Sequence, residues 1–198
     1  MADPDLPNKA RAGKTDEIRP CIRCFECFAG ITMKRQYRCA VNPEIGFEQD
    51  SRHALPTTAS KTVLVAGGGV AGMQAALTAA ERGHRVVLCE KSDRLGGVLR
   101  CEEKVPFKRL LGEYLDHQAR MISRAPIDVR LNTAVTPEVA QATGADVIIA
   151  AVGAQACVPQ IPGIDWPNVL GAEEAYLYPE KVGPAGASAG TGRRVLIL

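Results

Sequence analysis

Residues 62–91 read TVLVAGGGVAGMQAALTAAERGHRVVLCEK, and this stretch decides the fold. The short apolar runs Thr62–Ala66 and Arg85–Cys89 predict two strands that are buried on both faces. Between them, Val70–Arg82 is rich in Ala and Leu and predicts a helix, with Gly83 at its end. Strand, turn, helix and strand in this order predict an α/β fold with a parallel sheet.

The turn after the first strand carries a G-x-G-x-x-G motif, with its glycines at Gly67, Gly69 and Gly72. Between a strand and a helix, this spacing is typical of a Rossmann-like dinucleotide site. The first glycine permits the tight turn, the second lets the backbone approach a pyrophosphate, and the third lets the helix pack closely on the strand. The pyrophosphate is expected at the helix N-terminus, where free N–H groups favour an anion.

An acidic residue and a second glycine pair follow this motif. Glu90 ends the second strand, about 20 residues beyond the glycines, where an acid accepts hydrogen bonds from the adenosine ribose and disfavours the 2′-phosphate of NADP. Gly96-Gly97 comes shortly after it, and we expect Gly97 to approach the cofactor too. Such a pair is more typical of flavin-binding folds than of simple dehydrogenases, and the alternative is an ordinary loop turn.

Further elements extend the predicted α/β fold. Apolar residues at helical spacing predict a helix over Phe107–Ser123, and Val129–Leu131 predicts a short strand. Val147–Val152 predicts another buried strand, followed by Gly153 near the expected cofactor. Residues 183–192 read as a Gly/Ala/Ser linker, and Arg194–Leu198 predicts one more buried strand.

Four cysteines lie close together before this domain, in the spacing C-x2-C-x2-C-x11-C. They are Cys21, Cys24, Cys27 and Cys39. Three close thiolates and a more distant fourth favour an iron–sulfur cluster, whereas zinc sites more often show two separate C-x2-C pairs. The alternatives are a zinc knuckle or free thiols. Basic residues surround the motif and either favour an anionic cluster or form an ordinary solvated surface: Arg19, Arg23, Lys34, Arg35 and Arg38.

Composition limits the class of protein. The formal net charge of +2 gives no reason to expect a nucleic acid or an anionic membrane as partner. No apolar run reaches the roughly 18 residues of a spanning helix, and the polar N-terminus does not resemble a signal peptide. We therefore expect a cytoplasmic protein, in whose reducing compartment clustered cysteines bind metal more often than they form disulfides.

These motifs together resemble the NADH:flavin oxidoreductase family of 2,4-dienoyl-CoA reductase and trimethylamine dehydrogenase. The stretches that carry the resemblance are ADPDLPNKARAG (2–13), RPCIRCFEC (19–27), RCAVNP (38–43), the glycine-rich stretch and VGAQACVPQIPGID (152–165). The resemblance implies the tail of an FMN-bearing (β/α)8 barrel over 1–20 and an irregular iron–sulfur segment and linker over 21–60. It also implies the first part of an FAD domain over 61–192 and the start of a truncated NAD(P)H domain over 193–198.

By the same resemblance, this chain is the electron-relay part, with FAD and [4Fe–4S], of an NAD(P)H-dependent oxidoreductase acting on enoate or dienoyl substrates. Electrons would run from NAD(P)H through FAD and the cluster to FMN, whose site and catalytic residues belong to the missing barrel. The fragment alone is expected to be inactive. Two alternatives stay open: an amine dehydrogenase-like protein with ADP in the nucleotide site, and a zinc-stabilised nucleotide-binding module without a redox role.

Overall fold

A four-stranded sheet forms the centre of the molecule. The computed structural model describes residues 1–33, 35–53, 57 and 59–182. The strands are β1 (Thr62–Ala66), β2 (Arg85–Cys89), β3 (Ile127–Arg130) and β4 (Val147–Ala150). They run in the order β3-β2-β1-β4, and all three pairings are parallel. The predicted α/β fold with a parallel sheet is confirmed; the linker expected over 183–192 and the strand expected at Arg194–Leu198 lie outside the described residues.

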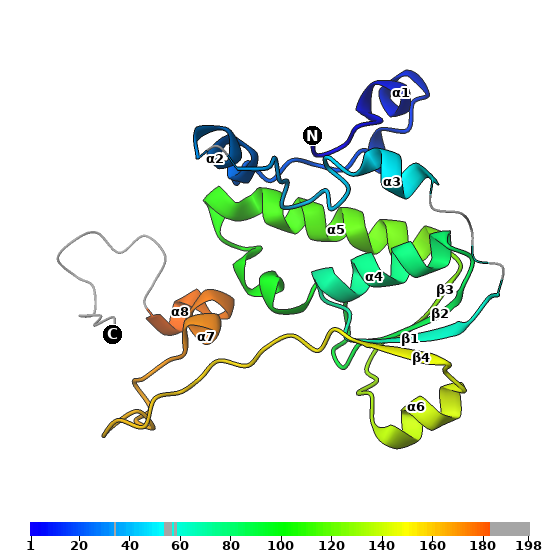
Figure 1. Cartoon of the computed structure of the whole chain (residues 1–198). Helices are drawn as coiled ribbons and strands as arrows, with labels where there is room; N and C mark the ends of the chain where they lie inside the picture. The colour runs from blue at the N-terminus through cyan, green and yellow to red at the C-terminus, as the bar shows by residue number, and fades with distance from the viewer. Residues whose placement is uncertain (34, 54–56, 58, 183–198) are drawn as a thin grey trace.

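Helices cover both faces of the sheet. The helices α4 (Val70–Glu81) and α5 (Arg109–Arg124) lie on one face, and α6 (Pro137–Thr143) lies on the other (Figure 1). The main core lies under α4 and α5; its fully buried side chains include Val65, Met73, Ala76, Val86, Leu88, Leu115 and Ile122. A smaller cluster of Leu64, Val87 and Cys89 faces α6. Cys89 is thus a core thiol, as expected, and its burial raises the pKa of that thiol.

Shorter elements complete the α/β part. The 3-10 turns η2 (Gly97–Glu102) and η3 (Pro106–Lys108) join the sheet to α5, and the short helices α7 (Ala172–Leu177) and α8 (Pro179–Val182) follow the long extended segment after β4. The helix α7 contacts η2. No helix among the described residues is both long enough and apolar enough to cross a membrane.

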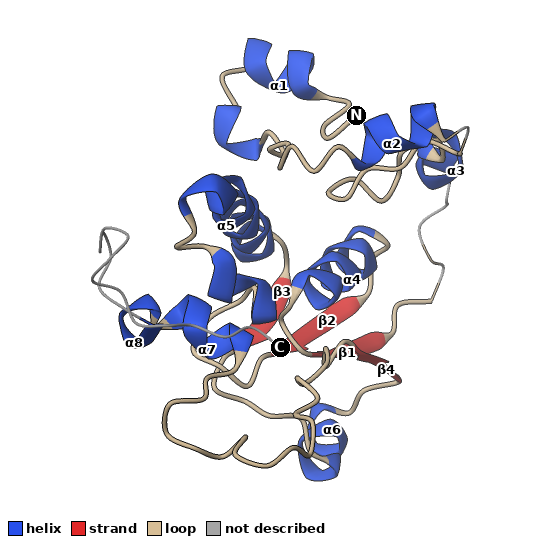
Figure 2. Ribbon diagram, turned by 90° about the vertical axis from the view of Figure 1, so that its left-hand side faces the viewer, coloured by secondary structure: helices blue, strands red, loops and turns tan. Residues whose placement is uncertain are grey.

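The N-terminal segment is more ordered than the sequence indicated. The first 20 residues, for which no helix was predicted, hold α1 (Leu6–Arg11) and η1 (Thr15–Glu17). Pro7 is compatible with α1 because it stands in the first turn, where no N–H is needed. The helices α2 (Glu26–Thr32) and α3 (Glu48–His53) follow, the latter inside the expected linker. All of them lie on the α4–α5 side of the sheet (Figure 2).

The prediction of a buried strand at the end of the sheet was wrong. The strand expected over Val147–Val152 ends at Ala150, and Ile148 is 53% exposed. Two causes combine. β4 lies at the edge of the sheet and pairs only with β1 among the described strands, and the apolar contacts of α6 are made with Leu64, Val87 and Cys89 on the two central strands.

The long amphipathic helix also begins later than predicted. Phe107, expected at its start, lies in η3, and its side chain is 83% exposed. The apolar face of α5 instead begins further along and includes the fully buried Leu115.

Replacing Leu115 with Ala should lower the free energy of unfolding by about 2–5 kcal/mol, because it leaves a cavity between α5 and the sheet. Phe107→Ala is the matched control and should change it by no more than about 0.5 kcal/mol. Urea unfolding of the purified chain measures both. Equal losses would contradict the described position of α5.

Candidate functional site

The glycine loop between β1 and α4 has the geometry that a dinucleotide site needs. Gly67 has φ of +106°, and a Cβ on it would lie 2.4 Å from the carbonyl oxygen of Ala151. A Cβ on Gly72 would lie 1.8 Å from the carbonyl oxygen of Gly67, so the helix packs directly on the turn. Only glycine fits these two positions, which supports the predicted roles of the first and third glycines.

Open space lies at the second glycine of the motif. Gly69 is the N-cap of α4, and the nearest atom to a Cβ built on it is the Cα of Gly97, 4.0 Å away. The first N–H groups of α4 have no partner within the helix. A ligand could therefore approach the backbone at Gly69 and meet the positive end of the α4 dipole.

The second glycine pair, Gly96-Gly97, packs against Gly68 and Gly69 of the glycine loop. The N–H of Gly96 donates to the carbonyl oxygen of Gly68 at 2.9 Å, and Gly69 forms an isolated parallel bridge with Gly96. The guanidinium of Arg100 closes this loop through a 2.9 Å hydrogen bond from its Nε to the carbonyl oxygen of Leu95. The two glycine pairs thus form one surface at the carboxyl ends of β1 and β2, the end of a parallel sheet at which ligands bind.

Glu90 supports this surface from beneath. Its side chain is 6% exposed, and its Oε2 accepts a 2.6 Å hydrogen bond from the N–H of Gly68. Its Oε1 accepts from the backbone N–H and from the hydroxyl of Ser92, both at 2.8 Å. A carboxylate has about four acceptor positions, so three are used within the protein and one is left for a ribose hydroxyl.

The protonation of Glu90 follows from these contacts. Burial raises the pKa of Glu90, but the hydrogen bonds donated by the backbones of Ser92 and Gly68 and by the Ser92 hydroxyl outweigh it, and the net pKa is lowered. Ser92 was missed by the sequence analysis. Its signal was its place two residues beyond the strand-ending acid, where a hydroxyl reaches back to the carboxylate.

The four cysteines divide into two groups. Cys21 and Cys24 are exposed and Cys27 lies half-buried in the first turn of α2, whereas Cys39 is half-buried against the main core. The described residues contain no group of three or more His, Cys, Asp or Glu side chains arranged to hold a metal ion. The structure therefore does not bring the four thiols together, and their role as ligands stays a prediction.

The loop that carries the first three cysteines nonetheless has an unusual backbone. Arg23 and Phe25, which alternate with the cysteines, have φ of 54° and 60°, and such conformations cost roughly 1–2 kcal/mol per residue outside glycine. The N–H of Arg23 donates to the Sγ of Cys21 at 3.4 Å. Four thiols are the donor set that an iron–sulfur cluster takes, so the residue types of this segment fit the predicted group.

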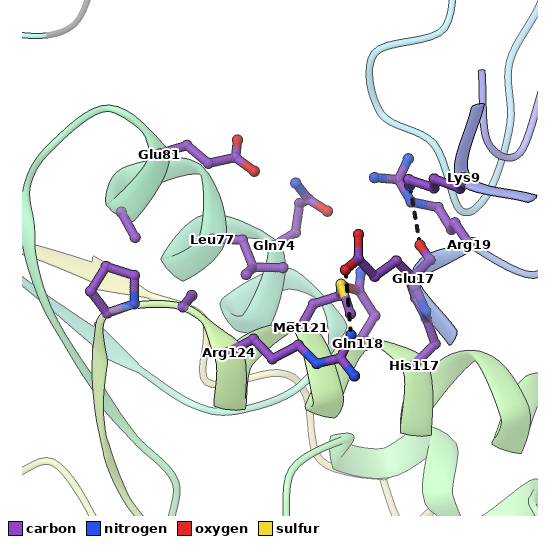
Figure 3. Close-up of a pocket in the computed structure, with 13 residues that line it drawn as sticks. Lys9, Glu17, Arg19, Gln74, Leu77, Glu81, His117, Gln118, Met121 and Arg124 are labelled. Atoms are coloured by element: carbon purple, nitrogen blue, oxygen red, sulfur yellow. Dashed lines mark hydrogen bonds and ion pairs between the residues drawn. The ribbon is translucent and has the colours of Figure 1, made fainter. Parts of the chain in front are cut away.

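A separate polar pocket of about 430 Å³ lies where the N-terminal segment meets α4 and α5 (Figure 3). None of its lining residues belongs to the two glycine pairs. Its cations have partners: Lys9 binds Asp3 and the carbonyl oxygen of Glu17, and Arg124 pairs with Asp16 and Glu17. We assign no ligand to this pocket, which is a seam between two parts of the chain.

Comparison with known proteins finds similarity to oxidoreductases. The model of the FAD dependent oxidoreductase family matches residues 62–151. The chain is 39% identical over 172 residues to an NADH oxidase of Thermoanaerobacter brockii, which covers 86% of this chain and 26% of that protein. These matches bear out the resemblance to flavin oxidoreductases that the sequence predicted. The chain is also 35% identical to a cinnamate reductase of Clostridium sporogenes, over 92% of this chain and 27% of that protein.

A solved structure extends the likeness to three dimensions. The 2-naphthoyl-CoA reductase in complex with 2-naphthoyl-CoA matches with a TM-score of 0.84 and 34% identity, over 90% of this chain and 27% of that one. The chain thus spans about a quarter of the length of the relatives it matches.

Glu90→Gln should destabilise the chain by about 1–3 kcal/mol, because an amide offers one oxygen where Gly68 and Ser92 require acceptors on both sides. Glu113→Gln is the control, since Glu113 forms only an exposed pair with Arg109. Because the pKa of Glu90 is lowered in the folded state, the ionised carboxylate adds to the free energy of unfolding at neutral pH. This stabilisation is lost as pH falls below the ordinary range of a Glu. Urea unfolding at pH 7 and pH 4 should show a smaller difference between wild type and Glu90→Gln at pH 4; an equal difference would contradict this role.

A second pH effect should arise at the seam. His117 is 3% exposed and its Nδ1 has no partner among the described residues. Burial is the main cause that lowers the pKa of His117, and the positive charges of Arg120, Arg19 and Lys9 lower it further. A hydrogen bond with the Asp16 backbone raises this pKa but does not outweigh them. The neutral ring is therefore favoured in the folded state, and stability should fall as pH drops below about 6.5.

Limited proteolysis of the N-terminal segment at pH 7.5 and pH 5.5 tests this effect. Cleavage should be faster at pH 5.5, and His117→Gln should reduce the difference between the two pH values. His84→Gln, in the turn before β2, is the matched control and should leave it unchanged. If the pH dependence of cleavage were lost in His84→Gln but kept in His117→Gln, His117 would not be the responsible group.

Proposed function

We propose that this chain is the FAD- and iron–sulfur-bearing electron-relay part of an NAD(P)H-dependent flavin oxidoreductase that acts on enoate-type substrates. The observation that carries the proposal is the combination of a glycine loop held by Glu90 and a four-cysteine segment packed on the same α/β unit. The family match over 62–151 supports the flavin, and similarity to a cinnamate reductase and to a 2-naphthoyl-CoA reductase supports the substrate class.

The glycine surface would hold the adenosine diphosphate half of FAD. Gly67 and Gly72 bring β1 and α4 close together, and the open backbone at Gly69 faces the pyrophosphate. The remaining acceptor position of Glu90 binds a ribose hydroxyl, and Gly97 lies beside Gly69 at the edge of the same surface. When bound, FAD supplies two-electron chemistry and an iron–sulfur cluster supplies single-electron transfer.

The cysteine segment would hold the cluster, with Cys21, Cys24, Cys27 and Cys39 as its ligands. The cations Arg23, Arg35 and Arg38 are exposed on the same segment and offset part of the negative charge of four thiolates. Lys34 lies outside the described residues. Arg19 has a different use, since its guanidinium donates to Asn42 rather than to a thiol.

The remaining partners belong to the parts of the protein that this chain does not contain. NAD(P)H, a small-molecule substrate and FMN, which the family holds in its barrel, are proposed to bind outside residues 1–198. Released nucleotide identified by chromatography tests the flavin: FAD supports the proposal, and ADP would move the protein to the amine dehydrogenase type.

Replacing Cys21, Cys24 or Cys39 singly with Ser should abolish or strongly reduce bound iron, because each removes one of four thiolate ligands. Cys157→Ser is the control, since that exposed cysteine lies outside the motif. Iron and acid-labile sulfide are assayed after anaerobic reconstitution. Unchanged iron in all three variants would overturn the assignment, and zinc in place of iron would establish the zinc-stabilised alternative.

A further inference from the structure

A buried amide lies at the centre of the N-terminal segment. Asn42 is 1% exposed, although its surroundings in the sequence predicted a polar linker. Its Oδ1 accepts hydrogen bonds from Nη1 of Arg19 at 3.1 Å and from the backbone N–H of Glu44 at 3.0 Å. Its Nδ2 donates to the carbonyl oxygen of Met1 at 2.7 Å. One side chain therefore ties together three stretches of chain that are far apart in sequence.

The partner Arg19 is itself held in place. Its backbone N–H donates to Oδ2 of Asp3 at 2.8 Å, and the same carboxylate oxygen accepts from Nζ of Lys9 at 2.8 Å. Figure 3 shows Arg19 and Lys9 side by side at the mouth of the seam, facing α4 and α5. The Asn42 amide thus completes a polar network that runs from the Met1 carbonyl through Arg19 to Asp3 and Lys9.

This network lies immediately after the most distant of the four cysteines. Cys39 and Val41 both pack against the main core, in the cluster to which Tyr114 of α5 belongs, while Cys21 and Cys24 are exposed. Ile22, between the first two cysteines, also packs against this core, so Cys39–Asn42 is one of two places at which the cysteine segment contacts the α/β unit, and the more deeply buried of the two. The position of Cys39–Asn42 depends on one apolar residue, Val41, and on one polar residue, Asn42.

We propose that Asn42 is a positioning residue for the iron–sulfur cluster, acting through Cys39 and Arg19. The inference rests on the proposed function. Asn42 ties the backbone just after the fourth thiolate to Met1 and Arg19, while its neighbour Val41 packs in the main core. Residues that orient a metal ligand typically change metal affinity by about 10–100-fold when they are replaced.

The test compares variants of the full chain after anaerobic reconstitution with ferrous iron and sulfide. Asn42→Ala removes all three hydrogen bonds of the side chain, and Arg19→Met removes only one of them. Asn8→Ala, on the exposed face of α1, is the matched control. Iron loss to an excess of chelator is followed together with FAD content, far-ultraviolet circular dichroism and the EPR spectrum of the dithionite-reduced protein.

Asn42→Ala should lose iron about tenfold faster than wild type and give a broadened EPR signal, with unchanged FAD content and circular dichroism. Arg19→Met should show a smaller effect of the same kind, and Asn8→Ala should show none. Unchanged iron loss and EPR in Asn42→Ala would overturn the inference, and so would a parallel loss of FAD and helical signal, which marks a purely structural role.

The outcome for the wild type separates this inference from the function on which it rests. Wild type that takes up no iron overturns the iron–sulfur assignment and this inference with it. A chain that keeps its iron after Cys39→Ser excludes Cys39 as a ligand, which also overturns this inference. Wild type whose cluster depends on Cys39 but is indifferent to Asn42→Ala overturns the positioning role alone.

Discussion

The hydrogen bond from the N–H of Gly68 to the carboxylate of Glu90 is the contact on which the nucleotide surface depends. It joins the turn after β1 to the end of β2 at 2.6 Å, inside the protein, where water competes little for either group. The second glycine loop is then placed by its own bond to Gly68. One carboxylate therefore joins two loops and two strands. Glu90, which was expected to bind a ligand, uses most of its acceptor positions within the protein.

The N-terminal segment is attached in a different way from the sheet. The α/β unit is held by apolar side chains from β1, β2, α4 and α5. The bonds of Asp3, Arg19 and Asn42 join stretches of the N-terminal segment to one another. The segment meets the α/β unit through the pair of Arg124 with Asp16 and through apolar residues such as Val41, which lies in the main core. Polar attachments of this kind are directional and fix orientation well, but they respond to pH and salt more than a packed apolar core does. The segment that carries the cysteines is thus ordered internally by charge and hydrogen bonding, and it is anchored to the core by Val41.

The parts of the fold that the sequence predicted well are those with a local physical cause. Apolar runs of five residues marked β1 and β2, and the glycine spacing marked the turn and α4, because sterics and burial act there on neighbouring residues. The failures depended on distant contacts. Nothing near Asn42 reveals that Arg19 and Met1 will surround it, and Ile148 has the same residue type as a buried strand residue although it lies on a rim.

The exposed rim of the sheet has a consequence for handling the chain. Among the described residues, no strand pairs with the outer side of β4. That side is flanked by the apolar side chains of Val147 and Ile148, and Val147–Ala150 contains no proline or lysine that would disfavour a neighbouring strand. An edge of that kind accepts a further strand from another copy. Concentrated solutions should therefore tend toward edge-to-edge self-association, and a fusion partner or a charged substitution at Ile148 would be the first remedy for poor solubility.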